Sequence, residues 1–363
     1  MSASAASTQR PVVSLVDTSL RDGMSSVSHQ FTPAQMADVA SGLDRAGIAT
    51  IEVGHGVGLG GSSKQFGLAA AADVEYVAAA AAAVDSASIA VLFVPGIATL
   101  TDLQQARDAG ASTVRVAVHC TEADCAEQAI RWAGERGMTV MSFLMMSHKL
   151  EPHQLAEQAA LLDSYGAEVI YVVDSAGALV PTTVAARVRA LRSAVAAQIG
   201  FHAHNNLGVA IGNALAAADA GAAFLDGSLR GLGASAGNAQ TEVLAAAFER
   251  AGYDTGVDMF TLIDTAEYVV APLMKEPQIV DETALVLGYA GVYSTFFHPT
   301  KRAARKFGVR TRDILLELGR RGVIGGQEDM IVEVAAELAA RVRQDSVSPT
   351  MHPRADDAVA VSQ

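Results

Sequence analysis

Short apolar runs alternate with helical stretches along the chain up to about Gly256. Several helical stretches end in Gly, as at Gly47 and Gly110, and a β-rich run begins about three residues later, as expected where a helix ends in the left-handed conformation. The runs are almost continuously apolar, which is typical of parallel strands covered on both faces. The predicted strands are residues 12–17, 50–53, 88–94, 113–118, 139–144, 169–173, 198–203 and 224–226.

Strand–helix units that repeat eight times over roughly 250 residues predict a (β/α)8 TIM barrel. A doubly wound sheet is the alternative, but it usually has fewer strands. Beyond Gly256 the pattern becomes helical, with predicted helices over 260–274, 311–318 and 329–343. We therefore expect a disordered N-terminal tail (1–11), a barrel (12–256), a small C-terminal helical domain (257–343) and a disordered tail (344–363).

Composition narrows the classes of function. Asp and Glu total 39 against 26 Lys and Arg, a net charge of −13, which argues against nucleic acid or an anionic membrane as partner. No apolar run approaches the ~20 residues that span a bilayer, and the first ten residues lack a secretion signal. Cys120 and Cys125 lack the CxxC spacing of a redox pair, so we expect unreactive thiols in a reducing cytoplasm.

The active site of a (β/α)8 barrel lies at the C-terminal ends of its strands. The residues that follow each predicted strand are therefore the candidates for chemistry. In chain order they include Arg21, Asp22, His55, His119, His148, Asp174, Ser175, His202 and His204.

His202 and His204 form the most informative pair in this set. Because they are two positions apart on one strand, both side chains point to the same face. With Asp22 from the first strand they would form a site for a divalent cation with open coordination positions. The alternative is that one histidine points inward and the other is hydrogen-bonded on a loop. Arg21, beside Asp22, is either a solvated ion pair or a clamp for a carboxylate or enolate.

Two glycine-rich segments could approach an anion. Residues 54–61 contain a G-x-G-x-x-G match, but no helix opens there, so we expect a flexible loop over the barrel mouth rather than a dinucleotide site. Residues 231–238 follow the eighth strand and lead into a helix. Their backbone N–H groups could face a substrate anion, or the glycines could serve close helix–strand packing.

Several sequence strings together resemble one known family. DTSLRDG (17–23) and HAHNNLG (202–208) resemble the opening and metal motifs of the metal-dependent barrel lyases, which include isopropylmalate synthase and hydroxymethylglutaryl-CoA lyase. More narrowly, the chain resembles the 4-hydroxy-2-oxovalerate aldolases from about Val12 to Ala340. The strings that carry this likeness are IEVGHG (51–56), HCTEAD (119–124), FLMMSH (143–148), LGYAGVYS (287–294) and GGQEDM (325–330).

The resemblance implies a metal-dependent (class II) pyruvate aldolase of aromatic hydrocarbon catabolism. Such an enzyme splits a 4-hydroxy-2-oxoacid, for example 4-hydroxy-2-oxopentanoate, into pyruvate and an aldehyde. It also implies an oligomer whose helical domain contacts an acylating aldehyde dehydrogenase, which receives the aldehyde. The cation is commonly Mn²⁺, with Co²⁺ or Mg²⁺ as alternatives. The implied residues are the metal ligands Asp22, His202 and His204, the enolate-stabilising Arg21, and the substrate-site residues Ser175, His202 and Tyr293, of which Tyr293 is also catalytic.

The chain departs from this family at the expected general base. The family has Arg-Asp-Gly-Ser-His after the first strand, and that His takes the proton of the substrate 4-hydroxyl. Here Met24 and Ser25 occupy the last two positions, so Ser25 stands at the catalytic position. An unactivated hydroxyl is not a base near pH 7, and the loss of a positioned base costs ~10²–10⁴-fold in rate. Val57 is a second departure, where the family usually has an acidic residue.

Three hypotheses therefore stay open. The first is an aldolase that uses another base, such as a water molecule held by Ser25 or a loop histidine. The second is a metal-dependent 2-oxoacid decarboxylase or tautomerase, which removes no hydroxyl proton. The third is a catalytically weak partner of the dehydrogenase. The length of the resemblance favours the aldolase.

Overall fold

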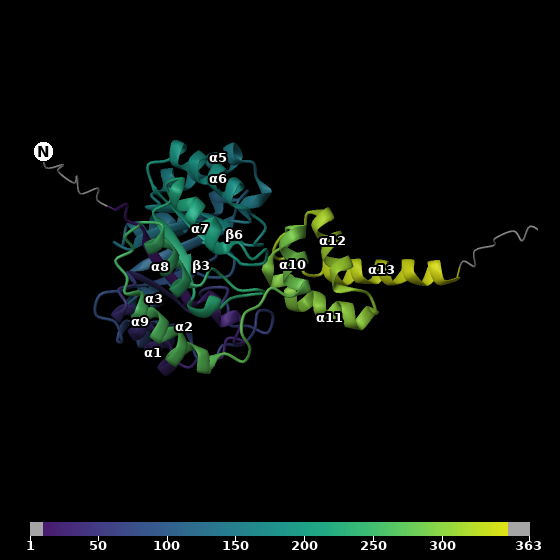
Figure 1. Cartoon of the computed structure of the whole chain (residues 1–363), viewed down its shortest axis with the longest axis horizontal. Coiled ribbons are helices and arrows are strands. Elements are labelled where there is room, and N and C mark those ends of the chain that lie inside the picture. Colours follow the sequence, from purple (N-terminus) through teal and green to yellow (C-terminus); the bar gives the residue numbers. More distant parts are fainter. Residues whose placement is uncertain (1–9, 348–363) are drawn as a thin grey trace, which may run out of the picture.

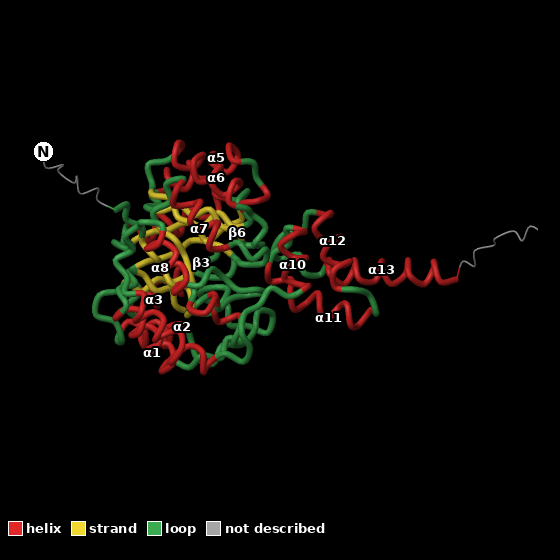
Figure 2. Tube along the Cα trace, viewed as in Figure 1, coloured by secondary structure: helices red, strands yellow, loops and turns green. Residues whose placement is uncertain are grey.

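The computed structural model describes residues 10–347, in which eight parallel strands close into a barrel. Each strand pairs with its neighbours in chain order, and the last pairs with the first, with Val16 opposite Asp226. Figure 2 shows the strands gathered inside the larger part of the molecule, with helices around them. The strands are β1 (Ser14–Leu20), β2 (Thr50–Val53), β3 (Ser88–Phe93), β4 (Thr113–His119), β5 (Thr139–Met145), β6 (Val169–Asp174), β7 (Gln198–Ala203) and β8 (Phe224–Gly227).

A helix follows each strand and covers the outside of the barrel. Local sequence sets where the first helix begins. Thr32 accepts a hydrogen bond from Gln35 N, its own N–H is bound by the Gln35 side chain, and Pro33 takes the first helical position. The predicted (β/α)8 barrel is confirmed. The helices are α1 (Pro33–Arg45), α2 (Asp73–Ala81), α3 (Leu100–Asp108), α4 (Glu127–Gly134), α5 (Pro152–Tyr165), α6 (Pro181–Ala194), α7 (Ala210–Asp219) and α8 (Thr241–Arg250).

The next helix, α9 (Met259–Asp264), also belongs to the barrel. It continues through a π-helical turn, η5 (Thr265–Val270), and packs against α1 and α8. Leu262 and Val270 are buried in the barrel core. The domain boundary expected after residue 256 therefore differs from the structure, because the first helix beyond it covers the barrel.

A second, smaller core lies beyond residue 280, at one side of the barrel (Figure 1). Its buried side chains include Leu287, Phe296, Leu315 and Val334. This core forms the predicted C-terminal helical region. Its helices are α10 (Glu282–Ala290), α11 (Phe297–Phe307), α12 (Thr311–Arg321) and α13 (Met330–Val347).

Both chain ends differ from the expected tails where the structure describes them. Pro11 O accepts a hydrogen bond from Asp254 N at 2.9 Å, so Pro11 is attached to the barrel. At the other end α13 runs to Val347, beyond the predicted helix end at 343. Residues 1–9 and 348–363, the rest of the expected tails, lie outside the described residues. Within 10–347, no helix has the length and apolar character needed to cross a membrane.

The helical region contacts the C-terminal ends of β5, β6 and β7. Ser294 Oγ donates to Ser175 O at 2.8 Å and accepts from Asn206 Nδ2 at 3.3 Å. On α10, a Cβ at Gly288 would lie 2.9 Å from both Asn206 Cβ and Gly177 O, so only glycine allows this approach. The helical region is thus fixed to the barrel face where the active site is expected.

His148 supplies another contact across this boundary and leads to a stability prediction. Its Nε2 bonds to Gly291 O at 3.1 Å, while its Nδ1 is buried without a hydrogen-bond partner among the described residues. Burial, together with the positive charge of Lys149, lowers the pKa of His148 to about 4. A histidine of the unfolded chain takes up its proton near pH 6.5, so the His148 contribution to stability falls as the pH drops from about 6.5 to 4.

We therefore expect His148→Gln, which keeps a donor for Gly291 O but does not titrate, to lose less stability in acid than the wild type. The expected difference is about 1–2 kcal/mol in the free energy of unfolding lost between pH 7 and 4.5. Urea unfolding of the metal-free protein at both pH values measures it. His153→Gln, at an exposed position of α5, is the matched control. Equal acid sensitivity of wild type and His148→Gln would contradict this account.

Candidate active site

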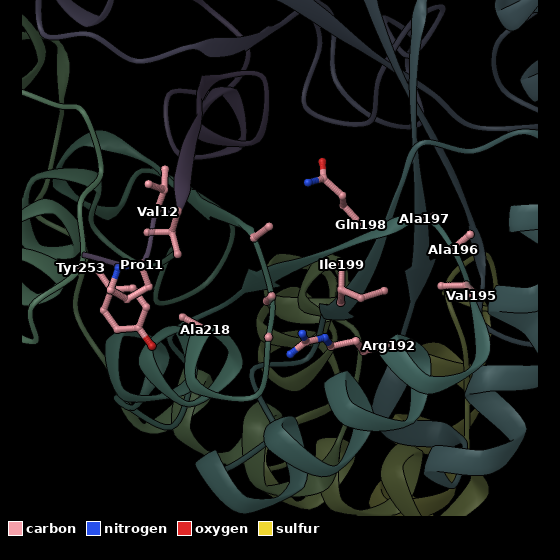
Figure 3. Close-up of a pocket in the computed structure, with 14 residues that line it drawn as sticks. Pro11, Val12, Arg192, Val195, Ala196, Ala197, Gln198, Ile199, Ala218 and Tyr253 are labelled. Carbon is pink, nitrogen blue, oxygen red and sulfur yellow. The ribbon is translucent and has the colours of Figure 1, made fainter. Parts of the chain in front are cut away.

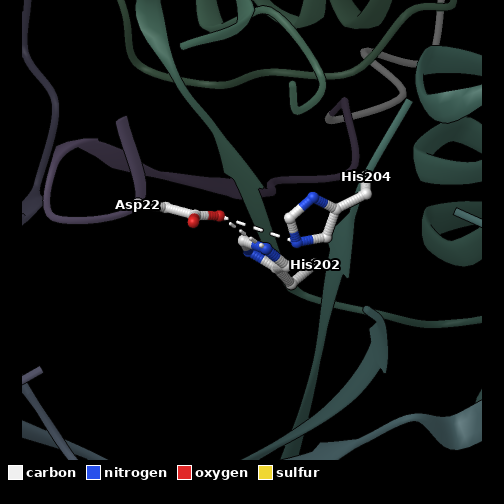
Figure 4. Close-up of side chains that lie close together, drawn as sticks. All are labelled: Asp22, His202 and His204. Atoms are coloured by element: carbon white, nitrogen blue, oxygen red, sulfur yellow. Dashed lines mark ion pairs between the residues drawn. The ribbon is translucent and has the colours of Figure 1, made fainter. Parts of the chain in front are cut away.

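Asp22, His202 and His204 lie together at the C-terminal end of the barrel. Asp22 begins the short 3-10 helix η1 (Asp22–Ser25) directly after β1, while His202 lies in β7 and His204 just beyond it. One ligand atom from each lies within 4.8 Å of the others, and all three residues are buried. Figure 4 shows Asp22 reaching towards both rings from the opposite side. Both histidines therefore point inward, and the alternative of one loop histidine is wrong.

Hydrogen bonds orient two of these three groups, His202 and Asp22. His202 Nδ1 bonds to Asp226 Oδ2 at 2.8 Å, which leaves His202 Nε2 facing Asp22 Oδ2 at 3.4 Å. Asn238 Nδ2 donates to the same Asp22 oxygen at 2.9 Å, and His204 Nε2 lies 3.7 Å from it. Support of this kind is characteristic of metal-ligating histidines and carboxylates. One carboxylate and two imidazoles that converge in a buried site fit a divalent transition-metal ion.

The protonation of the three groups is shaped by burial and by their mutual contacts. Burial opposes the charge of Asp22, but Arg21 and the two histidines hold the pKa of its carboxyl well below the usual range. Burial lowers the pKa of His204 to about 4. Burial alone would also lower the pKa of His202, but its bonds to Asp22 and Asp226 raise it to about 9. Near pH 7 the metal-free site thus holds an anionic Asp22 and a neutral His204, the forms that bind a cation, and a protonated His202 that releases its proton when a cation binds.

Arg21 is fixed beside this triad rather than solvated. Its Nε donates to Glu52 Oε2 at 2.7 Å and its Nη1 to Gly56 O at 3.3 Å. Nη1 also lies 3.4 Å from Asp22 Oδ1, and the residue is only 7% exposed. The solvated ion pair is therefore excluded, and a buried cationic group faces the same space as the triad.

Ser25 lies at the end of η1, close to Gly56 and the His29 ring. A Cβ built on Gly56 would be 2.8 Å from Ser25 Oγ and 2.7 Å from His29 Cε1. His29 Nδ1 accepts the Gly56 N–H at 3.4 Å, and the ring stacks on His55 with centroids 3.8 Å apart. The lone pair of His29 is thus directed at the backbone. The glycine-rich segment opens no helix, and its Gly56 and Gly61 lie close to the rings of His29 and His55 respectively.

Ser175 and Tyr293, the other predicted substrate-site residues, lie near the junction with the helical region. Ser175 Oγ accepts a hydrogen bond from Met146 N at 2.9 Å. Tyr293 OH lies 4.0 Å from Met145 Sδ. Burial and the Asp22 charge raise the pKa of Tyr293 to about 12, so its phenol stays protonated near neutral pH.

A cavity of about 390 Å³ adjoins Tyr293 between the barrel mouth and the helical region. Its lining is mostly apolar and includes Val94, Met145 and Ile324. A cavity of about 460 Å³ lies at the other end of the barrel, where Val12, Gln198 and Tyr253 surround it (Figure 3). None of the predicted site residues lines this second cavity.

The segment after β8 serves close packing. A Cβ on Gly237, whose φ is +80°, would overlap Gly231 O, and Asn238 N donates to Gly231 O at 3.0 Å. Asn205 N donates to Gly237 O at 2.8 Å. These contacts favour the packing interpretation of the glycines, and they place the Asn238 amide on Asp22.

Sequence reasoning missed several residues that support the site. Arg115 is completely buried and bonds to Glu52 and Asp226. The sequence signal for these residues was a charged residue within an otherwise apolar strand, in β2 (Glu52), β4 (Arg115) and β8 (Asp226). Asn238 carried no signal beyond its position after the eighth strand. The missed residues are Glu52, Arg115, Asp226 and Asn238.

Comparisons with known proteins cover both regions of the chain. An HMGL-like family model matches residues 12–269, and a model of the DmpG-like communication domain matches 278–340. Proteins named 4-hydroxy-2-oxovalerate aldolase 2 from Rhodococcus jostii and Nocardia farcinica are 76% and 75% identical, over 91% and 92% of this chain and 96% and 97% of theirs. A 4-hydroxy-2-oxovalerate aldolase from Carboxydothermus hydrogenoformans is 56% identical over 92% of this chain and 99% of its own.

Among solved structures, the carboxyl transferase domain of Rhizobium etli pyruvate carboxylase with oxamate and biotin superposes with a TM-score of 0.77. The match covers 94% of this chain and 63% of that chain at 18% identity. At this identity the likeness shows a shared fold.

Proposed function

We propose that this chain, which belongs to the 4-hydroxy-2-oxovalerate aldolase family, cleaves a 4-hydroxy-2-oxoacid such as 4-hydroxy-2-oxopentanoate into pyruvate and an aldehyde. Its relatives make it a class II pyruvate aldolase. The observation that carries the proposal is the convergence of Arg21 with Asp22, His202 and His204 at the active end of the barrel.

The reaction breaks the bond between C3 and C4 and leaves its electron pair on the pyruvate fragment as an enolate. A divalent cation held by Asp22, His202 and His204 would act as a Lewis acid towards the 2-oxo group, and we propose Mn²⁺, with Co²⁺ or Mg²⁺ as alternatives. The Arg21 guanidinium, fixed by Glu52, places positive charge where the enolate oxygen develops. The protonated phenol of Tyr293 is available as a donor to a substrate oxygen.

The proton of the 4-hydroxyl needs an acceptor, and Ser25 stands where the family has its histidine. His29 is poorly placed for this task because its Nδ1 accepts the Gly56 N–H. We therefore favour a water molecule held by the Ser25 hydroxyl. The same departure keeps a second candidate function in view, decarboxylation of a 2-oxoacid, which uses Arg21 and the triad but removes no hydroxyl proton.

A pyruvate-release assay separates these functions. The metal-free protein is supplied with Mn²⁺ and given 4-hydroxy-2-oxopentanoate or oxaloacetate in parallel, with an EDTA-treated sample as the control. Metal-dependent cleavage of the hydroxy acid supports the aldolase. Pyruvate from oxaloacetate alone would favour the decarboxylase, and no pyruvate from either substrate would contradict both.

We expect Ser25→His to raise cleavage of 4-hydroxy-2-oxopentanoate by ~10-fold or more, because an imidazole there titrates near neutral pH. Oxaloacetate decarboxylation should change little. Ser25→Ala, which removes the hydroxyl, should lower only the cleavage. Steady-state kinetics on both substrates measure the ratio. If Ser25→His binds Mn²⁺ normally but gains no cleavage, another group serves as the base.

The helical region supports a second element of the proposal, an acylating aldehyde dehydrogenase as partner. Its match to a DmpG-like communication domain and the cavity beside Tyr293 favour transfer of the aldehyde across this face. We also propose a cytoplasmic location, which the two free cysteines favour. The oligomer implied by the resemblance stays a prediction.

A further inference from the structure

A layer of charged side chains crosses the barrel interior next to the metal-binding triad. Glu52, Arg115, Tyr171 and Asp226 come from β2, β4, β6 and β8, the alternate-strand pattern by which barrels fill their interior. Such layers are usually built from bulky apolar residues. Here three of the four side chains carry charge, and all are buried.

Arg115 lies at the centre of this layer. Its Nη1 is 2.9 Å from Glu52 Oε2, and its Nη2 donates to Asp226 Oδ2. The guanidinium carbon lies 4.2 Å from the Phe143 ring centroid and 5.0 Å from that of Tyr171. A buried ion pair is weak evidence for stability, because desolvation of the charges offsets most of their attraction. The arrangement therefore calls for an explanation other than folding stability.

In each carboxylate, the oxygen that faces Arg115 also makes a contact with an active-site residue. Glu52 Oε2 also accepts from Arg21 Nε at 2.7 Å. Asp226 Oδ2 also accepts from His202 Nδ1 at 2.8 Å. Arg115 is thus joined through one carboxylate to Arg21 and through the other to His202, across the width of the barrel.

We propose that Arg115 is a positioning residue, which sets Arg21 and His202 relative to each other by holding Glu52 and Asp226 in place. This inference rests on the proposed function for the roles of Arg21 and His202. Without Arg115 both carboxylates lose their shared counter-charge and can shift towards Arg21 or His202. Displacements of about 1 Å in such groups reduce rates by ~10²-fold. Lysine does not replace it, because one ammonium cannot present two separated donors in a fixed plane.

The test compares Arg115→Lys and Arg115→Met with a neutral control, Met141→Leu. Met141 is buried, lies opposite Arg115 in the β4–β5 register, and contacts the Tyr171 hydroxyl. Calorimetric titration of the metal-free proteins with Mn²⁺ measures the metal affinity, which depends on the position of His202 and requires no substrate. We expect the Arg115 variants to raise the Mn²⁺ dissociation constant by ~10-fold or more. Their kcat for pyruvate release should fall by ~10–100-fold, and Met141→Leu should stay within about twofold in both.

A double-mutant cycle tests the route of the effect. If Arg115 acts on the metal site through Asp226, Arg115→Met in an Asp226→Asn background should weaken Mn²⁺ binding no further than Asp226→Asn alone. The double variant removes one charge of each sign, so the net charge of the layer is unchanged. Effects that multiply would show that Arg115 acts by another route and would overturn the inference.

Thermal unfolding and circular dichroism identify the folded fraction of each variant. A folded Arg115→Lys protein with wild-type Mn²⁺ affinity and kcat overturns the inference. The inference is also overturned if less protein folds but the folded molecules keep the wild-type Mn²⁺ affinity and kcat, because Arg115 then has only a structural role. If the wild type binds Mn²⁺ but cleaves no hydroxy acid, the proposed function fails while the titrations still decide the role of Arg115. A wild type that binds none of Mn²⁺, Co²⁺ and Mg²⁺ overturns both.

Discussion

Replacing Arg21 with alanine is expected to lower pyruvate formation by about 10²–10³-fold from 4-hydroxy-2-oxopentanoate and from oxaloacetate alike. Both reactions pass through the pyruvate enolate, and Arg21 is the buried cationic side chain held against Asp22. Mn²⁺ binding should persist, because all three ligands are present and Asp22 and His202 keep their supporting bonds to Asn238 and Asp226.

Steady-state kinetics on both substrates and calorimetry with Mn²⁺ measure these quantities in the same preparation. Arg21→Lys is the informative companion. It keeps the charge but cannot reproduce the bonds to both Glu52 and Gly56, so we expect a partial loss. An Arg21→Ala protein that decarboxylates oxaloacetate at the wild-type rate would refute the assigned role.

Asp22→Asn is expected to weaken Mn²⁺ binding by at least ~100-fold and to abolish metal-dependent pyruvate release. The amide has nearly the same shape, and its oxygen can still accept from Asn238 Nδ2. The lost quantity is therefore the negative charge that faces both imidazoles, whose pKa values the carboxylate influences.

Asp73→Asn provides the matched control for that experiment. Asp73 is a half-buried carboxylate that accepts hydrogen bonds from Gly60 N and His55 N, but it does not belong to the triad. Its replacement should leave the Mn²⁺ dissociation constant within about twofold of the wild-type value. Normal Mn²⁺ affinity in Asp22→Asn would exclude Asp22 as a ligand.

The parts of the fold that sequence reasoning predicted depend on short-range patterns. Each strand is an apolar run, so its position could be read locally, and residues 50–53 and 198–203 match β2 and β7 at both ends. The spacing of His202 and His204 likewise determined that both rings share one face. In contrast, α10 was not among the predicted helices. It is apolar nearly all round, so its sequence lacks the polar face that marks an amphipathic helix.

The supporting residues of the site escaped prediction because their partners are distant in sequence. Arg115 in β4 contacts Glu52 in β2 and Asp226 in β8. Both partners lie in strands that are not adjacent to β4 and meet it inside the barrel. Nothing near Arg115 in sequence specifies either partner. The same holds for His29, whose stacking on His55 and bond to Gly56 depend on how the loop after β2 folds back.

The contacts between α10 and the barrel determine how much of this chain makes up a working enzyme. Truncation after residue 270 would keep the whole barrel core and the candidate metal site of Asp22, His202 and His204. It would remove Tyr293, uncover Asn206 where Gly288 now packs, and delete the Ser294 hydroxyl that binds Ser175 O. We therefore expect the minimal catalytic fragment to be longer than the barrel, because a fusion or truncation designed at the barrel's edge would remove the proposed substrate-site residue Tyr293.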